Sequence, residues 1–234
     1  MVEQAVSYRA VRRRGVDGLE LRSSPAAAFA VAGLCLLALV LTWLIAEHVY
    51  TVQVKDWVLL HDFTLLDGPR VERYGGFLLH LLDPLEFIIW GIALVTFALG
   101  RGRPRTALAI AAVMILAPYT AETLKPLLGL SHPLLGQPHI GPGSWPSGHM
   151  TAAATLALCA VLVAPARRRA PVALVAGLFA GAAACALLIL AWHMPSDVLG
   201  GVLVASFWIA LAVAVLRAAE RRWPTHRPRP PAPR

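Results

Sequence analysis

Long apolar stretches separated by short polar segments make up most of this chain. A membrane-spanning helix needs about 20 predominantly apolar residues, because each residue advances about 1.5 Å and the hydrocarbon core is about 30 Å thick. Six stretches approach or reach that length and are predicted to be transmembrane helices. They cover residues 26–46, 77–99, 106–124, 150–164, 170–192 and 198–216. The pattern therefore predicts an all-α fold, a polytopic membrane helical bundle with six transmembrane helices.

The segment between the first two stretches, residues 47–76, is polar and mixed in charge. Short apolar runs interrupt it, one beginning at Trp57 and one at Phe63. Tryptophan is enriched at membrane–water interfaces, where its ring meets the acyl chains and its N–H meets water. We therefore expect a short interfacial helix after the first transmembrane helix.

Composition supports the membrane interpretation. Hydrophobic residues make up 58% of the chain and charged residues 15%, whereas soluble domains carry about 25% charged residues. This excludes an ordinary water-soluble domain and predicts one membrane domain over residues 26–216. Residues 1–25 are predicted to be a basic cytoplasmic segment. Residues 217–234, rich in Arg and Pro and without apolar periodicity, are predicted to be a disordered cytoplasmic tail.

Basic residues are divided unevenly between the two sides of the predicted bundle. Of 21 Lys and Arg residues, 17 fall on the side that holds both termini. The other four are Lys55, Arg70, Arg73 and Lys125. Because cytoplasmic loops carry the excess of Lys and Arg, both termini are predicted to be cytoplasmic in an integral protein of the plasma membrane. The basic excess is thus a topology signal, and no nucleic-acid partner is expected.

Polar residues gather at the predicted extracytoplasmic ends of the helices. Lys125 ends the third stretch, Pro-Ser-Gly-His at 146–149 opens the fourth, and residues 193–197 join the fifth to the sixth. Charged groups at membrane depth cost on the order of 2.5–3.5 kcal/mol, so they tend to mark function. Further acidic residues, Asp83, Glu86 and Glu122, are interpreted as pairing within the bundle or lining its opening.

These segments contain the parts of a phosphate site. The amides of Ser147, Gly148 and His149 at a helix N-terminus favour an anion, and Lys125 adds a point positive charge. Taken alone, the Pro-Ser-Gly-His run is equally consistent with a simple helix cap. The case for a site rests on its combination with the residues of the next extracytoplasmic segment.

That next segment supplies reactive groups. His193 is a candidate nucleophile if Asp197 holds its second ring nitrogen and fixes the tautomer. His149 is a candidate proton donor to the leaving oxygen, because an imidazole titrates near neutrality. Taken alone, Asp197 could simply neutralise the start of the sixth helix. No metal-ligand spacing occurs, and no cofactor is expected.

At these residues the chain resembles the integral-membrane branch of the type-2 phosphatidic acid phosphatase superfamily. That family has three blocks: Lys-x6-Arg-Pro, Pro-Ser-Gly-His and Ser-Arg-x5-His-x3-Asp. The second is intact here, the third keeps its His-x3-Asp half at 193–197, and the first keeps Lys125 and Pro133. The resemblance covers residues 122–201. Its two departures are His132 in place of one arginine, and Ala186 and Leu187 in place of the Ser-Arg pair.

The resemblance implies a role for each matched residue. It implies that His193 attacks phosphorus, that Asp197 orients it and that His149 is the acid. The implied substrate-binding residues are Lys125, His132, Ser147 and Gly148.

The implied activity is that of a metal-independent lipid phosphatase. It would hydrolyse a phosphomonoester or diphosphate on a lipid, of the polyprenyl diphosphate or phosphatidate type, through a phosphohistidine. Two alternatives stay open. The missing arginines favour a catalytically weakened relative that binds a phospholipid or a partner protein, and a lipid phosphotransferase would use the same residues. The oligomeric state is not fixed by the sequence.

Overall fold

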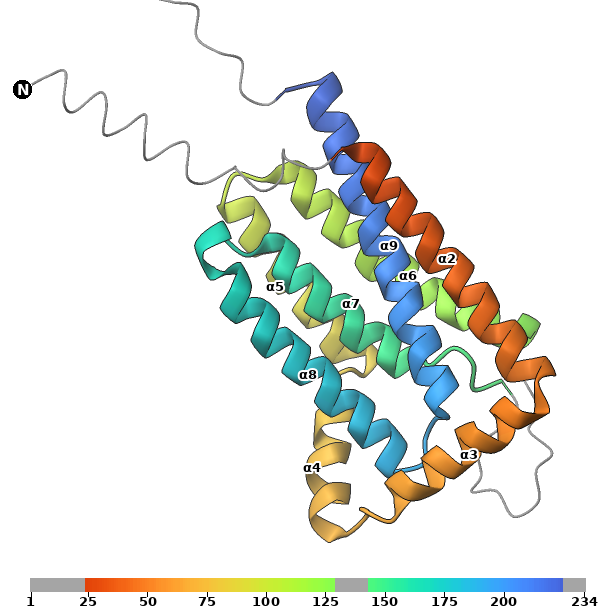
Figure 1. Ribbon diagram of the computed structural model, residues 1–234. Helices are drawn as coiled ribbons and strands as arrows, with labels where there is room; N and C mark the ends of the chain where they lie inside the picture. The colour runs from red at the N-terminus through yellow and green to blue at the C-terminus, as the bar shows by residue number, and fades with distance from the viewer. Residues whose placement is uncertain (1–23, 129–142, 225–234) are drawn as a thin grey trace, which may run out of the picture.

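The computed structural model describes residues 24–128 and 143–224, and these residues form helices and their connections. Long helices make up the body of the molecule (Figure 1). In chain order the helices are α2 (Pro25–His48), α3 (Tyr50–Thr64), α4 (Pro69–His80), α5 (Pro84–Gly100), α6 (Pro104–Leu128), α7 (Gly148–Val163), the short 3-10 helix η1 (Ala166–Arg168), α8 (Arg169–Ile189) and α9 (Pro195–Arg222). The predicted all-α fold is confirmed.

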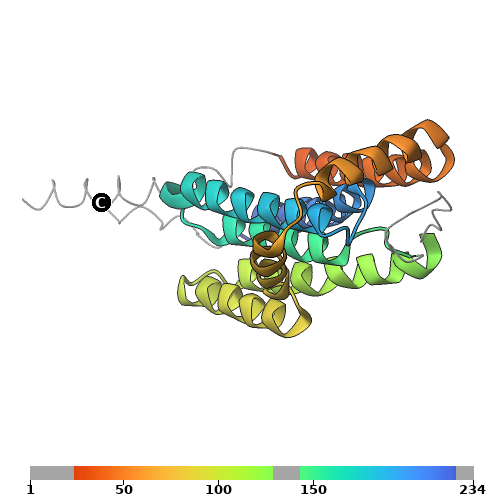
Figure 2. The same ribbon diagram turned by 90° about the horizontal axis from the view of Figure 1, so that it is seen from below.

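Helix α7 lies in the middle of the bundle. It packs against α5, α6, α8 and α9, while α2 lies along the outer side of α9 (Figures 1 and 2). Its side chains are mostly small, and Ala152, Ala153 and Ala154 are buried. Small residues let helix backbones approach closely, which is how helices associate where lipid removes the hydrophobic driving force. The alanine-rich sequence of α7 therefore suits its central position.

The outer helices expose large apolar side chains. Leu34 and Leu37 on α2 and Leu174 and Leu178 on α8 all point away from the bundle core. Contiguous apolar surface of this kind is rare on soluble monomers. Helices satisfy all their backbone hydrogen bonds internally, as a lipid environment requires. The chain is an integral membrane protein.

Within residues 24–128 and 143–224, four helices are long and apolar enough to cross a membrane: α2, α6, α9 and the continuous stretch Ala166–Ile189 that contains α8. A fifth span results if α4 and α5 count as one broken span, bent by 55°. Helix α7, with 16 residues, is shorter. Six transmembrane helices thus remain a prediction.

The region between α2 and α6 differs from the expected layout. The stretch 77–99 was expected to be one helix, but α4 ends at His80 and α5 begins at Pro84. A proline has no N–H and fits the first turn of a new helix better than the interior of an old one. Residues 47–76 form α3 and most of α4, two helices where one was expected.

The last helix is longer than expected. Residues 217–222 were assigned to a disordered tail, but α9 continues to Arg222. The guanidinium of Arg105, at the start of α6, donates to Glu220 at 3.0 Å and to the Trp223 carbonyl at 2.7 Å. This contact holds the last turns of α9 against α6. The rest of the predicted tail, residues 225–234, and residues 1–23 of the predicted N-terminal segment lie outside the described residues.

The bundle has two chemically different ends. The start of α2, the end of α9 and the α5–α6 and α7–α8 connections lie together at one end (Figure 1), and these connections carry Arg101, Arg103 and Arg167 to Arg169. The opposite end holds α3, α4 and the starts of α7 and α9. The two His-containing segments therefore lie at the end away from these arginines.

Contact between α7 and α9 is closest at Gly201. A Cβ atom there would lie 2.7 Å from the Ser147 carbonyl oxygen and 2.9 Å from the Thr151 amide nitrogen. Gly201→Ala is therefore expected to destabilise the protein by about 1–3 kcal/mol, the usual cost of overpacking. Gly177→Ala on α8, where a Cβ meets nothing within 4 Å, is the matched control. Thermal unfolding in detergent measures both, and equal melting temperatures for the two variants would contradict this packing.

Candidate functional site

His193 and Asp197 lie at the turn between α8 and the start of α9. Nδ1 of His193 is 3.3 Å from Oδ2 of Asp197. The same carboxylate oxygen accepts the Met194 amide at 3.0 Å, which is how a third-position acidic residue satisfies an exposed N–H at a helix start. Asp197 is fully buried, and His193 is nearly so. The aspartate thus engages Nδ1 of the ring and not Nε2.

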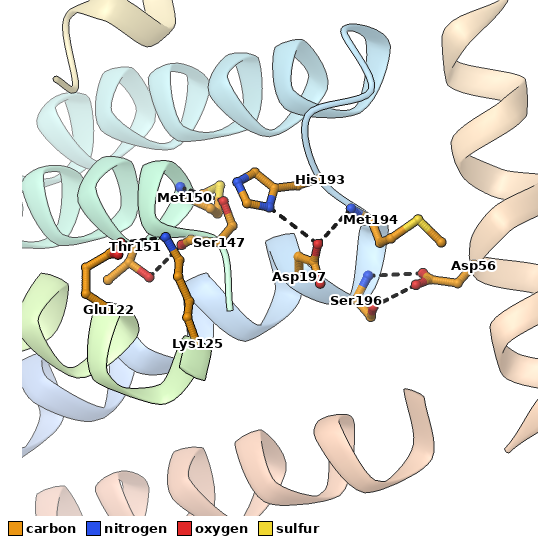
Figure 3. A network of polar contacts seen from close by, with 10 residues as sticks. All are labelled: Asp56, Glu122, Lys125, Ser147, Met150, Thr151, His193, Met194, Ser196 and Asp197. Carbon is orange, nitrogen blue, oxygen red and sulfur yellow. Dashed lines mark hydrogen bonds and ion pairs between the residues drawn. The ribbon is translucent and has the colours of Figure 1, made fainter. Parts of the chain in front are cut away.

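Ser147 ties the start of α7 to the start of α9. Its amide donates to the Asp197 carbonyl at 3.0 Å. Its side chain caps α7 by accepting the Met150 amide at 3.2 Å, and its carbonyl accepts the Thr151 hydroxyl at 2.8 Å (Figure 3). Ser147 is fully buried. These bonds hold the starts of the two helices together and use the Ser147 hydroxyl as an acceptor, so its own O–H group can still donate. The substrate-binding role of Ser147 stays a prediction.

Helix α7 begins at Gly148, two residues before the predicted stretch 150–164. The N–H groups of Gly148 and His149 are the first two of the helix, and such groups have no acceptor within the helix. A Cβ at Gly148 would lie 2.7 Å from Oε1 of Glu122 and 3.3 Å from Nζ of Lys125. The absence of a side chain at Gly148 thus lets the last turns of α6 approach these amides.

Lys125 comes from the last turn of α6. Its ammonium is 2.6 Å from Oε1 of Glu122, one turn earlier on the same helix. Figure 3 shows the Lys125 side chain and the His193 ring both extending toward the start of α7, from different helices. The expected pairing of Glu122 within the bundle is confirmed, and its partner is the residue predicted to bind phosphate.

His149 lies between these groups and the α4–α5 connection. Its ring meets the edge of the Trp192 ring, with centroids 5.5 Å apart. Its Nε2 is 3.8 Å from Oδ1 of Asp83, whose other oxygen is 2.9 Å from Nδ1 of His80. His149 also interacts electrostatically with His193 and Lys125. The structure therefore brings together the three basic residues that the sequence placed in one site.

Asp56 of α3 is a contributor that the sequence did not reveal. Its Oδ1 accepts the Ser196 amide at 3.0 Å, and its Oδ2 accepts the Ser196 hydroxyl at 2.6 Å (Figure 3). Ser196 lies between the two members of the His193–Asp197 pair. No motif marks Asp56, and 140 residues separate it from Ser196, so spacing gave no signal. Asp56 clamps the segment that carries the predicted nucleophile.

Apolar side chains fill the place where the resembled family has a Ser-Arg pair. Leu187 is fully buried among core residues of α8 and its neighbours. Ala186 faces α4, where a Cβ at Gly75 would lie 3.3 Å from its own Cβ. Both positions are thus occupied by buried apolar side chains.

Two further predictions concern the site. His132, the expected substitute for the other arginine, lies outside the described residues. Among the described residues, no three His, Cys, Asp or Glu side chains are grouped as metal ligands.

Known proteins with a similar sequence pattern or a similar fold agree with this arrangement. A family model described as the PAP2 superfamily matches residues 106–221, which include every site element from α6 to α9. The chain belongs to the PAP2 superfamily. Its fold is similar to the crystal structure described as the first transmembrane PAP2-type phosphatidylglycerolphosphate phosphatase from Bacillus subtilis. The TM-score is 0.66 at 19% identity, over 84% of this chain and 99% of that one. No curated protein matches.

Membership in the PAP2 superfamily agrees with the resemblance inferred from the three blocks. It makes this chain a membrane phosphatase at the level of the family. The structural similarity, at its low sequence identity, concerns the fold.

The Asp56 clamp gives a stability prediction. Asp56→Ala and Ser196→Ala are each expected to lower the melting temperature, since a hydrogen bond to a charged group contributes about 1.5–3 kcal/mol. In the double variant the loss of unfolding free energy should be smaller than the sum of the two single losses. The difference, which is the coupling energy between the two side chains, should be about 1 kcal/mol or more. Asp62→Asn, an exposed carboxylate on the same helix, is the control. Fully additive losses would show that the two side chains do not interact.

Proposed function

We propose that this protein is a lipid phosphatase that hydrolyses a phosphomonoester or diphosphate through a phosphohistidine at His193. The observation that supports it best is the position of the His193–Asp197 pair near the start of α7, which carries His149. The Lys125 ammonium reaches the same helix start from the last turn of α6. A buried carboxylate holding one imidazole, with a second imidazole close by, is the pattern of nucleophilic catalysis with a separate acid.

In the proposed first step, the lone pair on Nε2 of His193 forms a bond to phosphorus. The bond from phosphorus to the lipid oxygen breaks, and that oxygen takes a proton from His149. Asp197 stabilises the positive charge that develops on the His193 ring. In the second step His149, now neutral, takes a proton from water, the resulting hydroxide oxygen bonds to phosphorus, and His193 leaves as a neutral imidazole. The steps use these side chains and no metal.

The proposed site has fewer cations for binding substrate than the family's three blocks, which contain one lysine and two arginines. Lys125, Ser147 and the amides of Gly148 and His149 are the proposed phosphate-binding groups in the described residues, and His132 is a proposed addition. Losing one donor to a developing charge costs on the order of 10²–10³ in rate. We therefore expect slow turnover compared with a site that keeps both arginines.

The location of the site suits a lipid substrate. His193 and His149 lie at the end of the bundle that holds α3 and α4, away from the Arg-rich connections. Because basic connections stay cytoplasmic, we propose that both termini are cytoplasmic and that the site opens on the extracytoplasmic face of the plasma membrane. A lipid phosphate of the polyprenyl diphosphate or phosphatidate type would reach it from that leaflet.

One observation favours a second candidate. Leu187 packs where a phosphate-binding arginine would stand, and this supports a weakened relative that binds a phospholipid or a partner protein without turnover. A phosphotransferase is distinguished from both by product that forms only when a lipid or sugar acceptor is added.

Purified protein in detergent should release phosphate from phosphatidate or from a polyprenyl diphosphate. His193→Ala is expected to lower the rate on the order of 10³-fold or more, and His149→Ala by about 10²–10⁴-fold. His48→Ala, an exposed histidine on α2, should leave the rate unchanged. Colorimetric phosphate release with each lipid measures all four proteins.

Two results would reject the phosphatase. Wild-type protein that binds both lipids but releases no phosphate would favour the binding protein. Release that persists undiminished in both His193→Ala and His149→Ala would place the chemistry elsewhere.

A further inference from the structure

Among the described residues that form this site, Lys125 is the permanent cation. Between Lys125 and Arg217 the sequence contains three other Lys or Arg residues, Arg167 to Arg169. They lie in η1 and at the start of α8, at the opposite end of the bundle from His193 (Figure 1). The basic residues of α3 and α4 are exposed to solvent; they are Lys55, Arg70 and Arg73.

Each basic group of the site has a carboxylate beside it. Oε1 of Glu122 is 2.6 Å from Nζ of Lys125. Oδ1 of Asp83 is 3.8 Å from Nε2 of His149, and Oδ2 of Asp83 contacts the exposed His80. Oδ2 of Asp197 is 3.3 Å from Nδ1 of His193.

The proposed reaction determines the net charge of this cluster, because it requires a particular protonation state for each histidine. His193 must be neutral to attack, and His149 must be protonated to serve as the acid. The three carboxylates then oppose two positive charges, those of Lys125 and His149. In its reactive form this cluster is net negative before any phosphate arrives.

Glu122 is the carboxylate that a bound phosphate would meet first. Its Oε1 would lie 2.7 Å from a Cβ at Gly148, the first residue of α7. Gly148 also carries one of the first-turn amides that favour an anion. A phosphate bound at this helix start would therefore be near Glu122 as well as Lys125, and these two side chains already form an ion pair.

We propose that this site, in carrying out the phosphatase reaction proposed above, selects a lipid phosphorus group with a single negative charge over one with two or more. Of the two proposed substrate types, it therefore favours a phosphomonoester over a diphosphate. A phosphodiester and a singly protonated phosphomonoester both have that charge. Coulomb energy is proportional to the charge of the ligand, so both the attraction to the two cations and the repulsion by the three carboxylates double for a dianion. Because the carboxylates outnumber the cations, the net repulsion is twice as large for the dianion. Glu122 is thus a specificity-determining residue.

Sulfate and methyl sulfate test the proposal at equilibrium, because their charges, two and one, do not change near neutral pH. Tryptophan fluorescence can report binding, since Trp192 contacts His149. Wild-type protein is expected to bind methyl sulfate at least as tightly as sulfate. Glu122→Gln should tighten sulfate by about tenfold and methyl sulfate by about threefold, so that the logarithmic gain doubles with the charge.

Two further variants complete this test. Asp83→Asn should show the same two-to-one pattern, and it replaces Glu122→Gln if that protein does not fold. Glu72→Gln removes one charge from an exposed position in the first turn of α4 and should change neither affinity.

A lipid arm uses phosphatidylcholine vesicles that carry either phosphatidylmethanol, a singly charged phosphodiester, or phosphatidate, at mildly alkaline pH. Phosphatidylmethanol should compete with methyl sulfate at least as well as phosphatidate does. Tenfold tighter binding of sulfate or phosphatidate to the wild type, or equal effects of Glu122→Gln on both anions, would overturn the proposal. Because binding needs no turnover, a failure of the phosphatase reaction would appear separately, as anion binding without phosphate release.

Discussion

The joint between α7 and α9 is the constraint on which the rest of the site depends. The Ser147 amide donates to the Asp197 carbonyl at 3.0 Å, and Gly201 leaves no side chain between the helices. Because a helix start is rigid, fixing two of them against each other fixes the residues they carry. His149 follows Ser147 on one helix, and His193 is held by Asp197 on the other. Two imidazoles from distant parts of the sequence thus share one end of the bundle without sharing a loop.

The same end of the bundle also explains why this site differs from a strongly cationic phosphate cradle. The segment that would hold a Ser-Arg pair is packed by Leu187 and Ala186 against neighbouring helices. Carboxylates accompany the cation and the histidines that remain. The proposed charge selection rests on these carboxylates. The proposed slow turnover rests on the small number of cations in the described part of the site.

Much of this arrangement could be predicted from the sequence, for physical reasons that also explain the failures. Apolar stretches located the main helices because each segment that faces lipid must itself be apolar. Lys125, His149 and His193 were expected to lie close together because successive helices run in opposite directions, which places all three at the same end of the bundle. The break at Pro84 and the continuation of α9 to Arg222 depend on how a helix starts and on the Arg105–Glu220 contact. The bond from the Ser147 amide to the Asp197 carbonyl and the Asp56 clamp are tertiary hydrogen bonds, which no spacing encodes.

The most direct test of the central claim is to trap the covalent intermediate. Wild-type protein is mixed with a lipid phosphate carrying a radiolabelled phosphoryl group and quenched in alkali, in which phosphohistidine survives. Peptide mapping then locates the label. The account predicts alkali-stable, acid-labile label on His193, absent in His193→Ala and accumulating when the second step is slowed. Steady release of phosphate with no label on His193, or with label on another residue, would contradict it.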